Sequence, residues 1–279
     1  MSLASIAKKP IKKVFTAMPI LDVLSRRFLY KRVYPRLFFH EPEMRFFYNL
    51  PKGSFDVVVD IGAAMGSFCW ILEGRSNKIY AFEPGRIHNK CLNDASFGTN
   101  IEVIRAAVGS GPGTVNLYTP GSDSTDRYCA SVSAANPVTQ AADALVDEVP
   151  QIAIDDYMAE HLEPGRSIDF FKVDIEGYEF EAFKGARKTL ETHHPLIIAE
   201  IEERHNPDYR DVFRFLAGLG YSAYTYRDGR FTLHDGENIE AQQRPEDLEK
   251  RLHGGPDELS AYVNNFIFMH PQSKVKIPV

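Results

Sequence analysis

A short apolar run that ends in a glycine-bearing turn constrains the fold of this chain more than any other feature. It reads VVVDIGAAMGSF and covers residues 57–68. Three consecutive valines favour a strand that is buried on both faces, and Gly62 ends the run. Residues 66–73 then have the pattern of a short helix that stops before Gly74. A strand, a tight turn and a helix N-terminus in succession predict a site for the polar end of a cofactor.

Apolar strands and amphipathic helices alternate along the chain from residue 54, which predicts an α/β fold with a mostly parallel, doubly wound sheet. The expected strands cover 57–61, 78–82, 101–108, 115–118, 152–154, 168–173, 196–200, 221–226 and 264–269. The expected helices cover 66–73, 86–95, 179–190 and 209–219. Residues 120–137 are rich in small and polar side chains and are expected to form a loop. The polar residues 235–258 are expected to form a surface insertion with one short helix.

Positive charge is concentrated at the N-terminus. Residues 1–40 hold nine Lys and Arg against one acid, a net charge of +8, so the remainder of this −6 chain carries −14. An acidic body of this kind is a poor binder of nucleic acid. Prolines interrupt residues 1–52, and apolar residues recur at helical spacing between residues 20 and 29. We therefore expect a basic helical extension over 1–52, ahead of a domain over 53–279.

The extension has two interpretations. It is either a basic amphipathic segment that contacts an anionic membrane surface or a partner through residues 8–36, or a helix docked on the edge of the main domain with solvated basic side chains. No apolar run reaches about 18 residues, and Pro19 and Asp22 interrupt the apolar patch, so neither a membrane-spanning helix nor a cleavable signal peptide is expected. The three cysteines are irregularly spaced, which suits a reducing cytoplasm.

The spacing of the glycines separates two classes of cofactor. A dinucleotide pattern GxGxxG that starts at Gly62 requires glycines where Ala64 and Ser67 stand. The second glycine of this turn is instead Gly66, and Asp60 lies two residues before the first. A carboxylate there would repel a pyrophosphate but attract an ammonium or a sulfonium group. S-adenosylmethionine carries both cations, and its carboxylate would suit a helix N-terminus, so this cofactor is favoured.

A second acid supports cofactor binding without choosing between the two classes. Glu83 follows the second expected strand, 21 residues after Gly62, where it can accept hydrogen bonds from ribose hydroxyls. Ribose is common to NAD and S-adenosylmethionine. The alternative to a cofactor site is that the glycine turn only connects the strand to the helix.

Charged residues gather in the stretch IDFFKVDIEGYE, residues 168–179. Lys172 and Asp174 are two apart on an apolar strand and so project to the same side. Charges are rarely buried in a strand unless they are paired. At the carboxyl end of a parallel strand they would face the crevice where doubly wound folds bind ligands. Further candidates at this edge are Glu176 in the following turn, and Glu200, Glu202 and His205 after the next strand.

Three roles are open for this group. One carboxylate, or His205, could take the proton from an acceptor hydroxyl. Alternatively, Asp174, Glu176 and Glu200 could hold a divalent metal ion that acidifies the hydroxyl. In the third interpretation, Lys172 and Asp174 form an ion pair that only braces the turn. The other histidines are scattered, so a structural zinc site is not expected.

Six segments together resemble the successive blocks of FkbM-type methyltransferases. They are VDIGAAMGSF, AFEPGRIHNKCLND, AAVGSGPGTVNLY, VPQIAIDDYM, IDFFKVDIEGYEFEAFKGA and PLIIAEIE. Their order and spacing are similar over residues 55–227, with a weaker similarity at 264–266, and KVDIEGYE is the most specific block. The resemblance implies a Rossmann-like class I fold and S-adenosylmethionine-dependent O-methylation, usually of a hydroxyl on a sugar or secondary metabolite.

The resemblance also implies roles for individual residues. Asp60, Gly62, Ala63, Gly66 and Ser67 would line the methionine end of the cofactor, Glu83 with Pro84 the ribose, and Ala107 the adenine, while Asp174 and Glu176 would stand beside the transferred methyl group. The family often has a second proline where Gly85 or Arg86 stands here, so this chain departs from the family at the ribose loop.

The acceptor, a small molecule or a glycan, is expected to enter over residues 120–137, where Asp123, Arg127 and Tyr128 offer polar contacts. Two other functions remain as alternatives. The first is an NAD(P)-dependent oxidoreductase on the same fold, against which the missing glycine at position 64 argues. The second is a binding module without catalytic activity.

Overall fold

A computed structural model describes residues 25, 28, 42–121, 130–248 and 262–279 of the chain. Apart from Ser25 and Phe28, which are helical, the predicted membrane-contact segment 8–36 lies outside the described residues. The same holds for the three proposed acceptor contacts Asp123, Arg127 and Tyr128, and for the last part of the polar insertion, 249–258.

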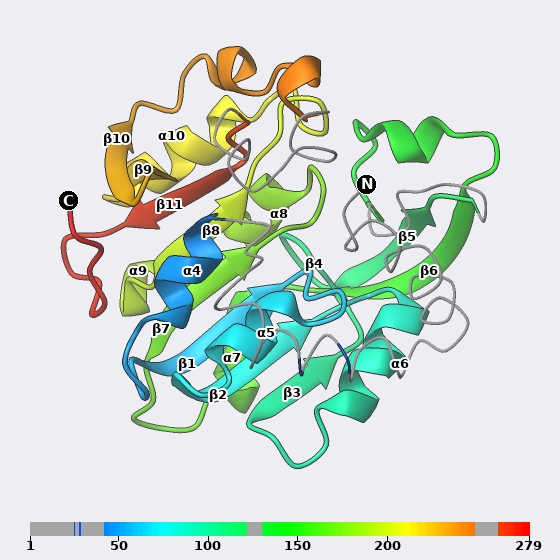
Figure 1. The fold of residues 1–279 in the computed structure, drawn as a ribbon. Coiled ribbons are helices and arrows are strands. Elements are labelled where there is room, and N and C mark those ends of the chain that lie inside the picture. The colour runs from blue at the N-terminus through cyan, green and yellow to red at the C-terminus, as the bar shows by residue number, and fades with distance from the viewer. Residues whose placement is uncertain (1–24, 26–27, 29–41, 122–129, 249–261) are drawn as a thin grey trace, which may run out of the picture.

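An eight-stranded sheet forms the centre of the structure, with the strand order β10-β9-β11-β8-β7-β1-β2-β3 (Figure 1). The strands are β1 (Phe55–Ile61), β2 (Ser76–Phe82), β3 (Ile101–Ile104), β7 (Ile168–Val173), β8 (Leu196–Glu200), β9 (Ser222–Arg227), β10 (Arg230–His234) and β11 (Asn265–Met269). The five neighbours from β3 to β8 are parallel, whereas β11 is antiparallel to both β8 and β9. The predicted α/β class with a mostly parallel, doubly wound sheet is confirmed.

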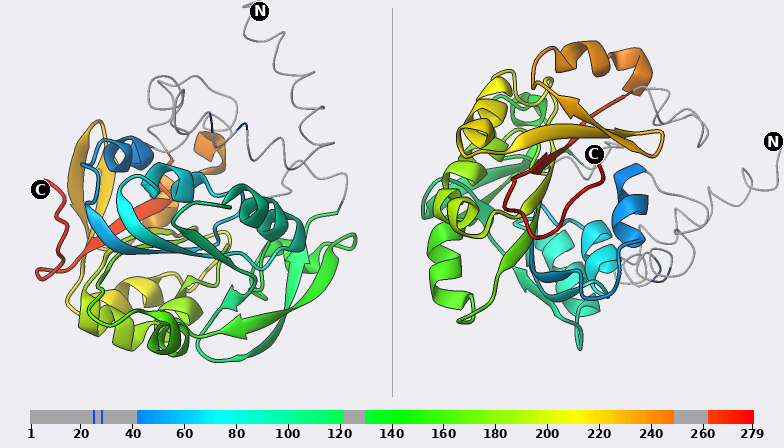
Figure 2. Two further views of the ribbon diagram at one scale, coloured as in Figure 1. Left: turned by 90° about the horizontal axis from the view of Figure 1, so that it is seen from below. Right: turned by 90° about the vertical axis from the view of Figure 1, so that its left-hand side faces the viewer.

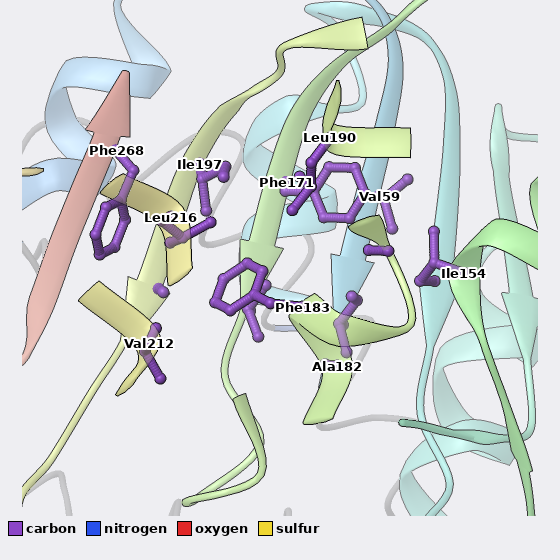
Figure 3. Close-up of a cluster of buried hydrophobic side chains, with 14 of the residues drawn as sticks. Val59, Ile154, Phe171, Ala182, Phe183, Leu190, Ile197, Val212, Leu216 and Phe268 are labelled. Atoms are coloured by element: carbon purple, nitrogen blue, oxygen red, sulfur yellow. The ribbon is translucent and has the colours of Figure 1, made fainter. Parts of the chain in front are cut away.

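Helices cover both faces of this sheet (Figure 2). Side chains of α7 (Ile154–His161), α8 (Glu179–Lys184), α9 (Arg187–His193) and α10 (Arg210–Gly218) pack in one apolar cluster, part of which is drawn in Figure 3. Those of α4 (Pro42–Tyr48), α5 (Ser67–Leu72) and α6 (Arg86–Ala95) pack in a second cluster. Val57 and Val59 of β1 belong to the first cluster and Val58 to the second, which explains why this strand is apolar on both sides.

A second, three-stranded sheet lies at the carboxyl edge of the first and corrects two of the predicted strands. It consists of β4 (Ala107–Val108), β6 (Leu145–Ile152) and β5 (Gly113–Thr119), in that order, and η2 (Pro137–Gln140) lies between β5 and β6 in the chain. The single strand predicted over 101–108 is wrong, because 107–108 leave the main sheet to pair with residues 151–152. The strand predicted over 152–154 is also wrong, since the observed strand β6 ends at Ile152 and the helix α7 begins at Ile154.

The single helix predicted over 179–190 is divided into α8 and α9. The carbonyl of Gly185 accepts a hydrogen bond from the Asp155 amide of α7 at 2.8 Å, so it is not used within a helix. The Asp155 carboxylate then accepts bonds from the amides of Lys188 and Thr189 at the start of α9. A contact with another element therefore overrides the local helical pattern.

The helix α7 and the strand β10 were not predicted from the sequence. The helix α4 lies within the predicted helical extension, and its Met44 and Phe47 are buried in the core beside α5. The strand β10 pairs with β9 through a turn at Asp228 and Gly229, which both have positive φ. An Asp-Gly pair between two strands is a hairpin signal that could have indicated this strand.

The described part of the polar insertion lies mostly on the surface, as predicted, but it contains two helical turns rather than one. These are η3 (Ile239–Gln242) and residues 245–248. Ile239 is fully buried in the core and anchors the insertion. Over the described parts of the chain, no helix combines the length and the apolar character that a membrane span requires.

Candidate active site

The turn after β1 is held against the ends of β2 and β7. Gly62 has φ +79°, and a Cβ added to it would lie 1.8 Å from the carbonyl oxygen of Asp174, so only glycine fits. The amides of Gly62 and Ala63 both donate to the carbonyl of Phe82, at 2.9 and 3.1 Å. The amide of Gly66 donates to the carbonyl of Ala63 at 2.7 Å. These three backbone amides are thus already bonded to carbonyl groups of the chain.

Glu83 links the two loops that follow β1 and β2. Its Oε2 accepts a hydrogen bond from the amide of Ala64 at 2.8 Å, and its Oε1 accepts one from the amide of Gly85 at 2.7 Å. Burial raises the pKa of this carboxyl to about 7, against the effect of the two amide bonds. Glu83, the predicted ribose ligand, therefore already joins the two loops through hydrogen bonds. Each of its oxygens keeps a second lone pair for a ligand.

The carboxylate of Asp60 is directed toward α5. It is 2% exposed, and the thiol of Cys69 donates to its Oδ2 at 3.0 Å. Burial raises its pKa to about 6, while the Cys69 thiol and the Lys172 charge act in the opposite direction. Ala63 is also buried, and Ser67 begins α5 with a partly exposed side chain. The predicted methionine-end residues therefore surround the start of α5.

A largely apolar pocket lies at the carboxyl ends of β1 and β2. Its lining consists of Ile61, Gly62, Phe82, Pro84, Ala106, Ala107, Val108, Leu117, Ala130, Val132, Ile175 and Tyr178. Three of the predicted cofactor residues, Gly62, Pro84 and Ala107, are among them. Because the lining comes from both sheets, the pocket depends on the departure of residues 107–108 from the main sheet.

Lys172 and Asp174 form an ion pair, which was one of the three interpretations of this group, but Asp174 follows β7 rather than lying on it. Nζ of Lys172 lies 3.0 Å from Oδ2 of Asp174 and 5.1 Å from the centre of the Phe68 ring. The Lys172 side chain is 3% exposed, whereas that of Asp174 is 29% exposed. Asp174 is therefore the half of the pair that a substrate can reach.

Glu176 contacts His205 across the ends of β7 and β8. Oε2 of Glu176 lies 2.5 Å from Nδ1 of His205, and both side chains are largely buried. Oε2 of Glu202 lies 3.7 Å from the same nitrogen and also contacts Arg204. Gly177 allows this close approach, since a Cβ there would lie 2.3 Å from the His205 carbonyl oxygen. The structure thus brings together two of the predicted catalytic residues.

Glu200 belongs to the same acidic group. Its pKa is raised well above the ordinary value by desolvation and by the negative charges of Asp174 and Glu202, with Lys172 opposing. Nδ2 of Asn264 donates to Glu200 at 2.5 Å and to Glu202 at 3.2 Å. Across the described residues, no three or more His, Cys, Asp or Glu side chains are grouped to hold a metal ion.

Several polar residues at this edge were not predicted from the sequence. They are Arg204, Asn264, Ser131 and Asn136, which all hydrogen bond to the acidic turns. The sequence did contain a signal for Asn264, because this residue belongs to the segment 264–266 that weakly resembles the family. Asn264 directly precedes β11, which is antiparallel to β8. Ser131 and Asn136 lie in a region that is generally rich in small polar residues, so nothing distinguished them.

A doubly wound sheet with a pocket and titratable side chains at the carboxyl ends of its strands defines a Rossmann-like ligand-binding protein of the α/β class. The particular family follows from the sequence match. The family described as the Methyltransferase FkbM domain matches residues 60–223, which is more than half of the chain. This chain therefore belongs to the FkbM methyltransferase family, and the resemblance drawn from its motifs is confirmed.

Solved structures with a similar fold include three methyltransferases. An FkbM methyltransferase from Methylobacillus flagellatus is 19% identical with a TM-score of 0.46 and covers 85% of this chain, which spans about half, 48%, of that protein. A SAM-dependent O-methyltransferase from Thermotoga maritima is 11% identical with a TM-score of 0.41, over 91% of this chain and 72% of that one. An rRNA methylase from Streptococcus thermophilus is 13% identical with a TM-score of 0.40, over 81% and 92%. No curated protein matches the chain.

Proposed function

We propose that this methyltransferase uses S-adenosylmethionine to methylate a hydroxyl oxygen of a sugar, a glycan or a secondary metabolite. One observation carries the proposal. Ile175 and Tyr178, which line the apolar pocket, flank Glu176, and Glu176 contacts His205. A pocket suited to a cofactor therefore lies beside a pair suited to move a proton.

The pocket suits the adenine end of S-adenosylmethionine, because its lining is almost entirely apolar and includes Pro84 and Ala107. The second lone pairs of the Glu83 carboxylate would accept ribose hydroxyls. Asp60 would act at the methionine end through its charge rather than by direct contact, because it is 2% exposed and its carboxylate is directed toward α5. Gly62, Ala63, Gly66 and Ser67 would border the same end.

When bound, S-adenosylmethionine supplies an electrophilic methyl group on a positively charged sulfur. Residues of the protein would position the acceptor and remove its hydroxyl proton. Glu176 holds Nδ1 of His205, so Nε2 is the ring nitrogen that would accept this proton. Asp174 is the alternative base, since its carboxylate is the more exposed one, and in that case Lys172 would hold it in place.

Calorimetry tests the cofactor assignment without knowledge of the acceptor. We expect S-adenosylhomocysteine to bind and NADH not to bind. Binding of NADH without binding of S-adenosylhomocysteine would overturn the proposal. The acceptor class is tested by incubating the protein with S-adenosylmethionine and a metabolite or glycolipid extract, and by searching for methylated products by mass spectrometry. A methylated nitrogen or carbon in the product would contradict the proposed O-methylation.

The proposal extends to cellular location. We place the protein in the cytoplasm, with peripheral contact to an anionic membrane through residues 8–36. The support is the net charge of +8 over residues 1–40, which contrasts with the acidic remainder of the chain.

A further inference from the structure

Two buried side chains converge on the backbone of the turn that carries Glu176. Oγ of Ser131 and Nδ2 of Asn136 each donate a hydrogen bond to the Glu176 carbonyl oxygen, both at 2.8 Å. Ser131 is 1% exposed and Asn136 is 2% exposed. The two donors come from the segment between β5 and β6, 45 and 40 residues earlier in the chain. The Glu176 carbonyl oxygen thus accepts two hydrogen bonds, one for each lone pair.

The segment that supplies these donors is itself held in place. The backbone of Ser131 exchanges two hydrogen bonds with Tyr118 of β5, each 2.9 Å long. Its Oγ also accepts the amide of Ser133 at 3.0 Å. Oδ1 of Asn136 accepts the amide of Val138 at 2.9 Å and so begins η2. Neither side chain can rotate away from Glu176 without losing a second hydrogen bond.

The turn requires this support because its backbone is in a disfavoured conformation. Glu176 has φ +55°, in the left-handed region that residues with a Cβ rarely adopt. Such a residue persists only where surrounding contacts determine it. The Gly177 amide donates to Oε1 of the buried Glu179, which holds the other side of the turn.

We propose that Ser131 and Asn136 are positioning residues for methyl transfer, which hold the Glu176 turn so that the Glu176 carboxylate meets Nδ1 of His205. This inference rests on the proposed function, in which the Glu176–His205 pair takes the proton of the acceptor. Ala130 and Val132, on either side of Ser131, line the apolar pocket. The same segment therefore forms part of the pocket wall and holds the turn that carries the proposed proton-transfer group.

Two substitutions remove one donor each. Ser131→Ala deletes the hydroxyl, and Asn136→Asp deletes the N–H donor but keeps an oxygen for the Val138 amide. We expect kcat to fall by up to about 100-fold in each variant, because small displacements of a catalytic group have effects of this size. We expect the KM for S-adenosylmethionine and the Kd for S-adenosylhomocysteine to change by less than about twofold. The double variant should lose less than the product of the two single effects, since both donors act on one carbonyl.

A spectroscopic measurement tests the same inference without any acceptor. The ¹⁵N resonance of His205 Nδ1 reports its contact with Glu176, and we expect it to shift in both variants. Ser96→Ala is the matched control, because Ser96 is also a buried serine whose hydroxyl donates to a backbone carbonyl, that of Leu92, at 2.7 Å. We expect kcat and the His205 resonance of this control to match the wild type.

The outcomes separate this inference from the proposed function. A folded Ser131→Ala or Asn136→Asp variant that keeps both the wild-type kcat and the wild-type His205 resonance would overturn the positioning role. If Ser131→Ala does not fold, Asn136→Asp tests the same contact from the other donor. A wild-type protein that fails to bind S-adenosylhomocysteine would overturn the proposed function instead, while the His205 resonance still decides the role of the two donors.

Discussion

Oε2 of Glu176 lies 2.5 Å from Nδ1 of His205, although the two residues follow different strands of the sheet. A carboxylate on one ring nitrogen orients the ring and leaves the other nitrogen to accept a proton. This contact is therefore the part of the site whose chemistry is most open to test.

Glu176→Gln keeps the size of the side chain but removes its charge. We expect kcat to fall by about 10²- to 10⁴-fold, the usual contribution of acid–base catalysis, while S-adenosylhomocysteine affinity is nearly unchanged. Steady-state kinetics and calorimetry measure the two effects. Equal losses in both would mean that Glu176 supports the cofactor site rather than proton transfer.

The substitution Asp174→Asn tests whether Asp174 is the general base or only forms a stabilising ion pair with Lys172. The substitution removes the carboxylate that lies 3.0 Å from the buried Lys172 ammonium, so we expect the free energy of unfolding to fall by about 1–3 kcal/mol. If Asp174 is the base, kcat also falls far more than cofactor affinity. Asp94→Asn is the control, since it breaks the exposed pair with Lys90 and should leave unfolding nearly unchanged. A loss of stability with unchanged kcat would leave Asp174 as a brace alone.

Gly62→Ala tests the close approach of the first turn to β7. An added Cβ would meet the Asp174 carbonyl oxygen at 1.8 Å, at a position with φ +79°. Gly98→Ala is the matched control, because Gly98 has φ +74° but no atom within 4 Å of an added Cβ. We expect the control to lose about 1–2 kcal/mol in unfolding free energy, and Gly62→Ala to lose at least about 2 kcal/mol more. Equal losses in urea denaturation would show that the contact with Asp174 is unimportant.

The raised pKa of Glu179 predicts how the free energy of unfolding depends on pH. Burial raises its pKa to about 7 in the folded protein, against an ordinary value of 4.5. The folded state therefore holds this proton to a higher pH than the unfolded chain. The resulting stabilisation is fully present below about pH 4.5 and is lost as the pH rises toward about 7, by at most about 1.4 kcal/mol per pH unit.

Glu179→Gln should remove only the contribution of this residue, because burial also raises the pKa of Asp60, Glu83 and Glu200. Denaturant unfolding between about pH 5 and 8 should show a smaller decline of stability in the variant, which should exceed the wild type at the upper end. Oε1 of a glutamine can still accept the Gly177 amide that lies 2.9 Å from Oε1 of Glu179. Parallel pH profiles for the two proteins would contradict the expected proton uptake.

The N-terminal segment is predicted to bind anionic vesicles. Pelleting with phosphatidylserine-containing vesicles should weaken as salt is raised and should be lost when residues 1–40 are deleted. The deletion ends before α4, because Met44 and Phe47 of that helix are buried in the core. Binding that is insensitive to salt, or that survives the deletion, would count against the electrostatic contact.

The sequence predicted the elements whose signal is local. The strands 168–173 and 196–200 and the helix 86–95 match β7, β8 and α6 residue for residue, because each is an apolar or amphipathic run with clear ends. The three-stranded sheet could not be predicted, since the pairing of residues 107–108 with 151–152 is non-local. Periodicity carries no information about which distant segment a strand joins.

As with the fold, only the local part of the candidate site was predicted from the sequence. Lys172 lies on β7 and Asp174 directly follows the strand, so their pairing still follows from a spacing of two in an extended chain. The contact of Glu176 with His205 depends on how the loops after β7 and β8 fold, which no motif spacing specifies. The donors from Ser131 and Asn136 depend on a loop with no periodic pattern, so only the folded chain reveals them.

The position of β1 in the main sheet has a consequence for how the protein is made. This strand lies between β2 and β7, and its partner residues on β7 come more than 100 residues later in the chain. At about 5–20 residues per second, a ribosome would need roughly 5–20 s to reach β7 after finishing β1. During that time the valine-rich edge of β1 has no neighbour on one side, and an unpaired strand edge in an incompletely folded chain favours aggregation.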